Sequence, residues 1–384
     1  MNISDLRLPA RQAKASAGPQ RGSFDLPFFV LTLLLLTIGV IMVLSSSFAR
    51  AYAQGKSPTY YFVRQAAFAV AGVVAMILLS KVRMATYRRL SLLVLGVSIF
   101  LLAVVWIPHI GTRVNGARRW LSLGFTTFQP SEIAKIAVVL FFSSMTYKEQ
   151  MQTFRYGVVP FMVVTVIIVG LLMLEPHLSA SIIIMALAIV MMFVGGIKLS
   201  YLLVGMGSAG ALLLIASKFV PYVHKRIVSW RDPFADTSAA GYQIVQSLYS
   251  IGSGGFLGLG LGQSRQKYLY LPEEHNDYIF SIVCEELGYV GAIAILILFA
   301  LLICRGYWIA AHSPDRYSFL VGIGITTLLS IQVFLNIAVV TNLIPCTGIS
   351  LPFFSYGGTA LLMQLGEMGI ILSISRDIPT KKAR

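Results

Sequence analysis

Long runs of apolar residues, each close to twenty residues, recur along the chain between short polar segments. Twenty helical residues, each rising about 1.5 Å, cross a hydrocarbon layer of about 30 Å. A helix also satisfies its own backbone hydrogen bonds, which lipid cannot do. The pattern therefore predicts an all-α protein that crosses a membrane many times. No apolar and polar alternation is long enough to predict a membrane β-barrel.

The apolar runs predict about ten membrane-spanning helices. They cover residues 26–46, 61–80, 90–107, a span that starts near 130, 157–174, 179–197, 199–220, 277–303, 319–340 and 356–375. The first run is too long for the core of a signal peptide and lacks a clear cleavage site, so we expect it to remain as an anchor. Residues 26–375 then form one transmembrane domain between a basic tail at 1–25 and a short tail at 376–384. A long polar loop at about 221–276 separates the seventh span from the eighth.

The composition agrees with a membrane protein, because 57% of the residues are hydrophobic and 12% are charged. The net charge of +15 would suit nucleic acid, but Lys and Arg lie mostly in short loops, where they fix orientation against a membrane. We therefore expect no nucleic-acid partner. The basic clusters predict that both termini are cytoplasmic and that the loop at 221–276 lies outside. Cys284, Cys304 and Cys346 predict neither a disulfide framework nor a metal site.

A cationic cluster precedes the fourth span on the predicted outer side, where positive charge is disfavoured. It consists of Arg113, Arg118 and Arg119 beside Trp120. Long loops can cross a membrane regardless of their charge, which is the structural alternative. For this shorter segment we favour function, since several cations beside an aromatic ring suit a phosphate-bearing lipid.

Two oppositely charged residues lie inside the first turns of the fourth span. Glu132 and Lys135 are three residues apart and so share one helix face. They could form an ion pair that lowers the cost of placing both groups in the membrane, or they could belong to a functional site. In the second case Lys135 is a candidate to meet a diphosphate. Glu367, midway along the last span, needs an interior partner that the sequence does not identify.

Acidic residues gather where the eighth span begins. Asp277 could cap the amino end of this helix, and so could Asn276. Eight residues further along, Glu285 lies on about the same face and about 12 Å deeper, which predicts a wet cavity because a lipid-facing carboxylate is costly. Glu286 must then face a neighbouring helix or a bend. Glu273 can be a solvated loop acid, and so can Glu274.

Two glycine-rich segments interrupt the apolar pattern. The run Gly252–Gly262 is no phosphate-binding loop, since no P-loop lysine and serine follow it. We expect close-packed or re-entrant backbone, which is tolerated at membrane depth only when it is buried in protein or lines water. The segment 348–358 has the same interpretation, because Pro352 and its glycines break helical form at the mouth of the last span.

Four segments resemble, in order, the SEDS family (shape, elongation, division and sporulation), which comprises FtsW-, RodA- and SpoVE-like proteins. They are NGARRWLSLGFTTFQPSEIAK at 115–135, GYQIVQSLYSIGSGGFLGLGLG at 241–262, LPEEHNDYIFSIVCEELGYVG at 271–291 and GISLPFFSYGGTALL at 348–362. The resemblance implies a ten-span fold in the bacterial cytoplasmic membrane and a glycosyltransferase that polymerises lipid II on the outer face. Its implied partners are the nascent glycan strand, a class B penicillin-binding protein, membrane lipid and other division or elongation machinery. The division, elongation and sporulation branches share this chemistry, and the sequence does not separate them.

The resemblance also identifies candidate site residues. By position, Asp277 matches the family's essential carboxylate, as a general base or a metal ligand, and the implied cofactor is a divalent cation, Mg²⁺ or Mn²⁺. The candidates for substrate binding in the matching segments are Arg118, Arg119, Trp120, Glu132, Lys135, Glu274, His275, Asn276, Glu285 and Ser355. At position 177 this chain has His where many members have Asp, so a function that depends on that aspartate is open here.

The implied reaction makes a β-1,4 glycan from an α-linked glycosyl diphosphate and therefore inverts at the sugar carbon. One displacement suffices, with a base on the acceptor hydroxyl and cationic help for the departing diphosphate. A lipid II flippase or another carrier would also explain midplane charges such as Glu367 and Glu285. Against a carrier, the polar groups crowd the outer face and we find no inverted repeat. A third hypothesis is a non-catalytic scaffold for a penicillin-binding protein, in which Asp277 would be dispensable.

Overall fold

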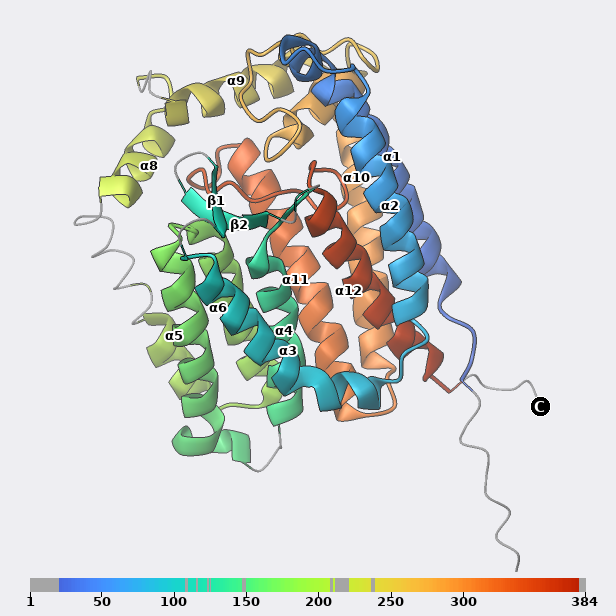
Figure 1. Ribbon diagram of the computed structural model, residues 1–384, viewed down its shortest axis with the longest axis vertical. Helices are drawn as coiled ribbons and strands as arrows, with labels where there is room; N and C mark the ends of the chain where they lie inside the picture. Colours follow the sequence, from blue (N-terminus) through green and yellow to red (C-terminus); the bar gives the residue numbers. More distant parts are fainter. Residues whose placement is uncertain are drawn as a thin grey trace, which may run out of the picture.

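Long apolar helices run side by side in a single bundle (Figure 1). The computed structural model describes residues 21–379, apart from 108–109, 115–116, 123, 125, 147–149, 208–209, 211–220 and 236–238. The long helices are α1 (Leu26–Ala53), α2 (Tyr60–Leu79), α3 (Met84–Val104), α4 (Pro130–Met145), α5 (Val159–Leu174), α6 (Leu178–Gly195), α10 (Ile279–Ala311), α11 (Arg316–Val340) and α12 (Gly358–Arg376). Short η1 (Gln150–Gln152) and η2 (Phe154–Val158) precede α5.

Eight of the helical segments are long and apolar enough to cross a membrane, counted over the described residues. The shorter α4 lies beside them in the bundle. Of the seventh predicted span, residues 199–207 are helical, and most of the remainder lies outside the described residues. The prediction of a helical, multi-pass membrane protein with about ten spans is therefore confirmed.

Local sequence explains where several helices begin. The side chain of Asp25 accepts a hydrogen bond from the backbone N of Phe28 and caps α1, and Asp315 caps α11 in the same way through Ser318. The third span begins at Met84, six residues before its predicted start. Tyr87 explains this difference, because its ring is buried and its hydroxyl donates to the backbone oxygen of Leu79.

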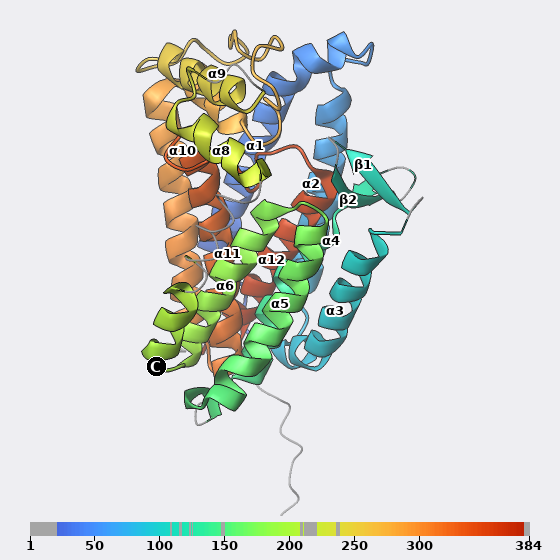
Figure 2. The same cartoon turned by 90° about the vertical axis from the view of Figure 1, so that its left-hand side faces the viewer.

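A small antiparallel sheet follows α3 and was not predicted from the sequence. Its strands are β1 (Gly111–Val114), β2 (Ala117–Ser122) and β3 (Thr127–Phe128), in the order β1-β2-β3. Trp120 pairs with Thr112, and Leu121 pairs with Phe128. The sheet lies at one end of α4 (Figures 1 and 2), so the outer cationic cluster is held on strands rather than on an irregular loop.

The segment expected to be a long loop at 221–276 is largely structured. It contains α8 (Pro221–Arg231) and α9 (Ala239–Ser253), which lie across one end of the bundle (Figure 2). Helix α9 is fastened to α10 by two buried hydroxyls: Ser247 Oγ lies 2.7 Å from Ser281 Oγ, and Ser250 Oγ donates to the Ser281 carbonyl at 3.0 Å. Ser281 therefore packs against α9 and does not face a cavity.

Helix α10 is broken at Gly288, where φ is 67° and ψ is −170°. The glycine run satisfies the backbone groups exposed at this break, because Leu259 N donates to Glu285 O at 2.9 Å and Tyr289 N donates to Gly255 O at 2.9 Å. A Cβ on Gly258 would lie 2.2 Å from the Glu286 carbonyl oxygen. The expectation of close-packed glycine backbone is therefore confirmed.

Two carboxylates of α10 hold this glycine loop in place. Glu285 is fully buried and accepts hydrogen bonds from Ser250 Oγ, Ser264 Oγ and the backbone N of Arg265. Glu286 accepts from Ser45 of α1 at 2.7 Å and from Lys267 at 3.0 Å. The expectation that Glu286 faces a neighbouring helix is confirmed, whereas the prediction that Glu285 lines a wet cavity is wrong.

The two described chain ends meet at the end of the bundle opposite α8 and α9 (Figure 1). The guanidinium of Arg21 binds both carboxylate oxygens of Asp377, at 2.7 and 2.9 Å, and also donates to the carbonyls of Lys81 and Val82. These contacts tie the amino-terminal segment and the α2–α3 turn to the last turn of α12. Both ends therefore lie on one side of the bundle, as the charge pattern predicts.

Candidate functional site

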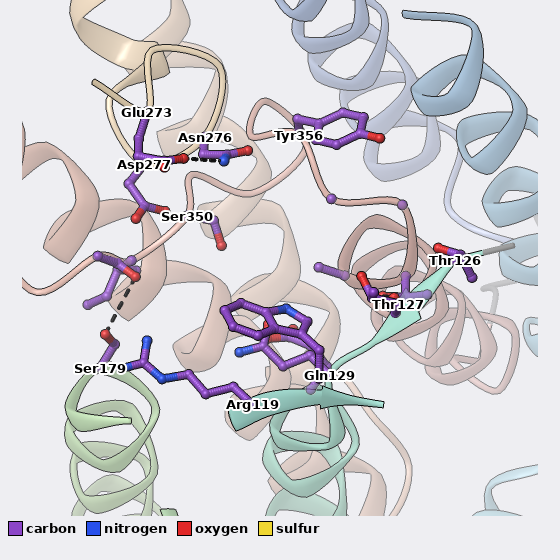
Figure 3. A pocket seen from close by; sticks show the side chains of 18 of the residues that line it. Arg119, Thr126, Thr127, Gln129, Ser179, Glu273, Asn276, Asp277, Ser350 and Tyr356 are labelled. Atoms are coloured by element: carbon purple, nitrogen blue, oxygen red, sulfur yellow. Dashed lines mark hydrogen bonds between the residues drawn. The ribbon is translucent and has the colours of Figure 1, made fainter. Parts of the chain in front are cut away.

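A polar cavity of about 710 Å³ lies between the small sheet, the amino ends of α4, α6 and α12, and the segments that precede α10 and α12. Figure 3 shows Asp277 and Arg119 entering this cavity from different elements, the first from the segment before α10 and the second from β2. The fold thus brings together the two polar clusters that the sequence places more than a hundred residues apart.

Seven of the predicted site residues line the cavity: Arg119, Trp120, Glu132, Lys135, His275, Asn276 and Asp277. Four others do not. Glu274 is fully buried and forms a two-pronged ion pair with Arg50, with both N–O distances at 2.8 Å. Burial alone would raise the pKa of Glu274, but the nearby His275 and the hydrogen bonds from Arg50 lower it. Glu274 is therefore a structural anchor, and its interpretation as a solvated loop acid is wrong.

The remaining three residues also lie outside the cavity lining. Ser355 Oγ donates to the backbone oxygen of Asn276 at 2.8 Å, so it holds the segment before α10 rather than facing substrate. Glu285 fastens the glycine loop, as described above. Arg118 has a buried Nε without a hydrogen-bond partner among the described residues. The geometry supports none of the three as a direct substrate contact.

Asp277 is held in place through its backbone carbonyl, and its side chain does not cap helix α10. Helix α10 starts after Tyr278, and no side chain caps it, so the capping prediction for Asp277 and Asn276 is wrong. The buried amide of Asn336 on α11 donates to Asp277 O at 2.8 Å and to Ile349 O at 2.6 Å. This amide clamps the segment before α10 to the segment before α12.

The carboxylate of Asp277 lies against a glycine that must remain a glycine. Gly348 has a φ of +72°, and a Cβ there would lie 3.1 Å from Asp277 Oδ2. Burial, and to a smaller extent Glu273, raise the pKa of Asp277 from its ordinary 3.8 to about 6 against the lowering effect of Arg119 and Arg226. A carboxylate with a pKa near 6 suits a general base that works close to neutral pH.

The cavity lining also carries cations, among them the buried Lys135 and the half-buried Arg119. Lys135 Nζ lies 2.8 Å from Glu132 Oε2, and both side chains are buried. Glu367 of α12 is buried and interacts electrostatically with both residues, which supplies the interior partner that the sequence left unidentified. Arg119 donates to the backbone oxygens of Glu175 and Pro176 in the α5–α6 turn.

Several cavity residues, among them Tyr61, Tyr356 and Gln129, were missed by the sequence analysis. Tyr61 and Tyr356 form an aromatic wall with the predicted His275, with ring centroids 4.9 Å apart for Tyr61–His275 and for Tyr61–Tyr356. Gln129 and His177 contact each other across the α4 and α6 ends. Tyr356 lies in the glycine-rich segment 348–358, which the sequence analysis had identified, so this residue could have been found. No sequence pattern marks Tyr61 or Gln129.

No group of three or more His, Cys, Asp or Glu side chains within the described ranges is arranged to hold a metal ion. Asp277 and Glu273 do interact electrostatically. Proteins commonly hold Mg²⁺ through one or two carboxylates together with substrate phosphates. This donor set therefore fits a cation that arrives with a phosphate-bearing substrate, and the predicted divalent cation stays a prediction.

Fold and site together define a multi-pass membrane protein with a polar cavity at one end of its bundle, lined by a carboxylate of raised pKa and by cations. Residues 25–379 match the family described as cell cycle protein, that of FtsW, RodA and SpoVE. The chain belongs to this family, and the resemblance seen in the sequence is confirmed.

Two curated relatives cover almost the whole chain. Stage V sporulation protein E of Bacillus subtilis (strain 168) is 42% identical over 363 residues, which span 93% of this chain and 98% of the relative. A probable peptidoglycan glycosyltransferase FtsW of Trichlorobacter lovleyi is 38% identical over 364 residues, which span 92% of this chain and 94% of the relative.

Solved structures agree with the fold. A chain of a peptidoglycan synthase complex that coordinates polymerization and crosslinking superposes with a TM-score of 0.78 at 28% identity, covering 92% of this chain and 98% of that one. The rod shape determining protein RodA of Thermus thermophilus gives a TM-score of 0.69 at 26% identity, covering 93% and 98%. The helical architecture and its connectivity are therefore shared across the family.

Proposed function

We propose that this protein is a peptidoglycan glycosyltransferase that polymerises lipid II into β-1,4 glycan strands on the outer face of the bacterial cytoplasmic membrane. The observation that carries the proposal is one cavity lined by Asp277, Arg119 and Lys135. A glycosyl diphosphate needs a base for its acceptor and cations for its leaving group, and this cavity supplies both. The name of the FtsW relative, a probable peptidoglycan glycosyltransferase, supports the same activity.

The reaction is one displacement at the anomeric carbon of the donor sugar. The acceptor hydroxyl attacks this carbon while its proton passes to the Asp277 carboxylate. The bond between the anomeric carbon and the diphosphate oxygen breaks, and its electron pair leaves with the lipid diphosphate. The configuration inverts from α to β, as a single displacement requires. A positioned base of this kind commonly contributes about 10²–10⁴ in rate.

The leaving diphosphate gains negative charge as this bond breaks. Arg119 and Lys135 are the residues we infer to stabilise that charge, since pre-positioned cations act strongly in a site shielded from water. Glu132 holds Lys135 through the 2.8 Å ion pair, and Glu367 lies beside both. This arrangement keeps the ammonium near the cavity before substrate arrives.

A divalent cation would be held by Asp277 and Glu273 together with diphosphate oxygens. When bound, it supplies charge neutralisation at the departing diphosphate. If Asp277 serves the cation instead, the acceptor proton needs another base. Measuring Mn²⁺ binding to the wild type and to Asp277→Asn in the presence of lipid II separates these two roles, since only the loss of a metal ligand weakens cation binding.

We infer that both termini are cytoplasmic and that the cavity end of the bundle faces outside, because the meeting point of the chain ends is basic and lies opposite α8 and α9. A class B penicillin-binding protein is the inferred partner that crosslinks the product. The identities of 42% and 38% to sporulation and FtsW proteins, against 26% to a RodA structure, favour a role in sporulation or division.

The test is polymerisation of purified lipid II by the purified protein with Mg²⁺ or Mn²⁺, followed on gels of labelled glycan. We expect polymer from the wild type, none from Asp277→Asn and normal yield from Asp232→Asn, a matched change at an exposed aspartate after α8. Polymer at the wild-type rate from Asp277→Asn would falsify the proposed role of this residue. Movement of labelled lipid II across vesicles by protein that makes no polymer would instead favour a flippase.

A further inference from the structure

His177 lies in the cavity wall between two cations that come from different elements. It forms the turn between α5 and α6, and its side chain is 6% exposed. Arg119 of β2 donates to the backbone of the same turn, at the Glu175 and Pro176 oxygens. Arg119 and Lys135 of α4 both act electrostatically on the imidazole. A neutral ring therefore sits where two positive charges meet.

The hydrogen bonds of this ring are only half satisfied. The amide nitrogen of Gln129 lies 3.3 Å from His177 Nε2. Because that NH₂ group can only donate, Nε2 accepts and the ring proton is on Nδ1. Among the described residues Nδ1 has no hydrogen-bond partner. An unsatisfied buried donor is energetically costly, so an acceptor from outside the chain is expected here.

The surrounding charges indicate which acceptor fits. Glu132 is engaged with Lys135. Glu175 is buried in the same turn, and burial raises its pKa to about 8 in spite of Arg119, so this carboxyl is mostly protonated at neutral pH. No ionised carboxylate of the turn then repels an incoming anion. Two cations, a neutral N–H and a protonated carboxyl together favour phosphate oxygens.

We propose that His177 is a third diphosphate-binding residue, which donates its ring N–H to the same diphosphate that Arg119 and Lys135 hold. The inference rests on the proposed function and adds a residue that the sequence comparison left without a role. It also explains why a histidine can lie between two cations, because the ring is neutral in the free protein. The bound diphosphate then offsets the charge of Arg119 and Lys135.

This arrangement makes substrate binding depend on pH. Burial, then Arg119 and Lys135, lower the pKa of His177 to about 3 in the free protein. A bound diphosphate moves this pKa back toward its ordinary 6.5, so binding takes up a proton. Linkage requires that affinity rises as pH falls below about 6.5, by up to about tenfold per unit. Above that pH the ring is neutral in both states and contributes no pH dependence, so a further fall in affinity toward pH 8 reflects the ionisation of Glu175.

The experiment measures binding of purified lipid II from pH 5.5 to 8 in protein carrying Asp277→Asn, which removes both turnover and the titration of Asp277. We expect affinity to rise toward pH 5.5 in this background. Adding His177→Asn should retain most of the affinity at pH 8, because an amide can replace the donor, but should abolish the rise. Adding His177→Leu should also weaken binding at pH 8 by roughly tenfold. Adding His312→Gln, at an exposed imidazole that follows α10, should keep the rise.

The outcomes are distinguishable. If both His177 variants bind lipid II with the affinity and pH dependence of their parent, the inference is overturned while the proposed function stands. If the Asp277→Asn parent binds no lipid II although it is folded, the proposed function itself fails. Should His177→Leu lower the melting temperature strongly, His177→Asn decides alone, because loss of the pH dependence with retained affinity is not a consequence of instability.

Discussion

The carboxylate of Asp277 is predicted to destabilise the fold at the pH where it works. Its pKa is raised from the ordinary 3.8 to about 6, chiefly by burial and also by Glu273. A shift of about two units corresponds to roughly 3 kcal/mol, at 1.36 kcal/mol per unit. Well below pH 3.8 the group is protonated in both folded and unfolded protein. As pH rises toward 6, the unfolded chain ionises first, and the folded state loses this stability.

Replacing the carboxyl by a neutral amide should therefore stabilise the protein while removing its activity. We expect Asp277→Asn to melt a few degrees higher than wild type at pH 8, a difference that is mostly lost at pH 4. Thermal unfolding of the detergent-purified protein, followed by fluorescence across this pH range, measures the effect. The same samples are tested for polymerisation of lipid II, where the variant should be inactive. Such opposition between stability and activity is common at active sites.

Asp25→Asn is the matched control, since it makes the same chemical change in a different environment. Asp25 caps α1 and accepts from Arg305 at 2.6 Å, so the amide should lower the melting temperature at pH 8. The reasoning about Asp277 is refuted if Asp277→Asn melts at or below the wild-type temperature at pH 8, or if its stabilisation is the same at pH 4 and pH 8.

Two further predictions concern the surroundings of this carboxylate. Gly348→Ala and Gly55→Ala both place a side chain at positive φ, at a cost of about 1–2 kcal/mol, but only at Gly348 would the new Cβ meet Asp277, 3.1 Å away. Polymerisation should fall by about tenfold or more in Gly348→Ala alone; equal activities would contradict the positioning argument. Glu132→Gln or Lys135→Met should each destabilise the protein by about 3–5 kcal/mol, since each leaves a buried group unpaired. The double variant should regain the melting temperature but not the polymerisation rate, and recovery of both would remove the pair from the site.

The spans could be predicted from the sequence because lipid sets a length and a composition for a helix, and both are visible locally. Errors arose where a polar residue was taken as a boundary. Arg88 and Arg89 suggested a loop, yet both lie within α3. Long cationic side chains can lie along a helix and keep their charged ends at the membrane surface. Arg88 does so beside the ring of Tyr317, 6.0 Å from its centroid.

The placement of the candidate site followed only partly from the sequence. The helical-face argument that joined Asp277 to Glu285 assumed one continuous helix, but α10 begins after Tyr278 and breaks at Gly288. The glycine run Gly252–Gly262 packs on the backbone exposed at this break, and the residues that follow the run hydrogen-bond to Glu285. The clamp made by Asn336 and the contact between Gln129 and His177 join residues far apart in the chain, so no local pattern could predict them.

The interaction partners of the buried carboxylates distinguish the structural carboxylates of this protein from the proposed catalytic one. Glu274, Glu285 and Glu286 are all buried, and each is compensated by a cation or by several hydrogen-bond donors. Asp277 differs, because burial raises its pKa in spite of the electrostatic attraction of Arg119 and Arg226. The hydroxyl of a bound acceptor would donate a hydrogen bond to this carboxylate and offset part of the cost of burying it. We therefore expect substrate binding in the cavity to raise the stability of the fold.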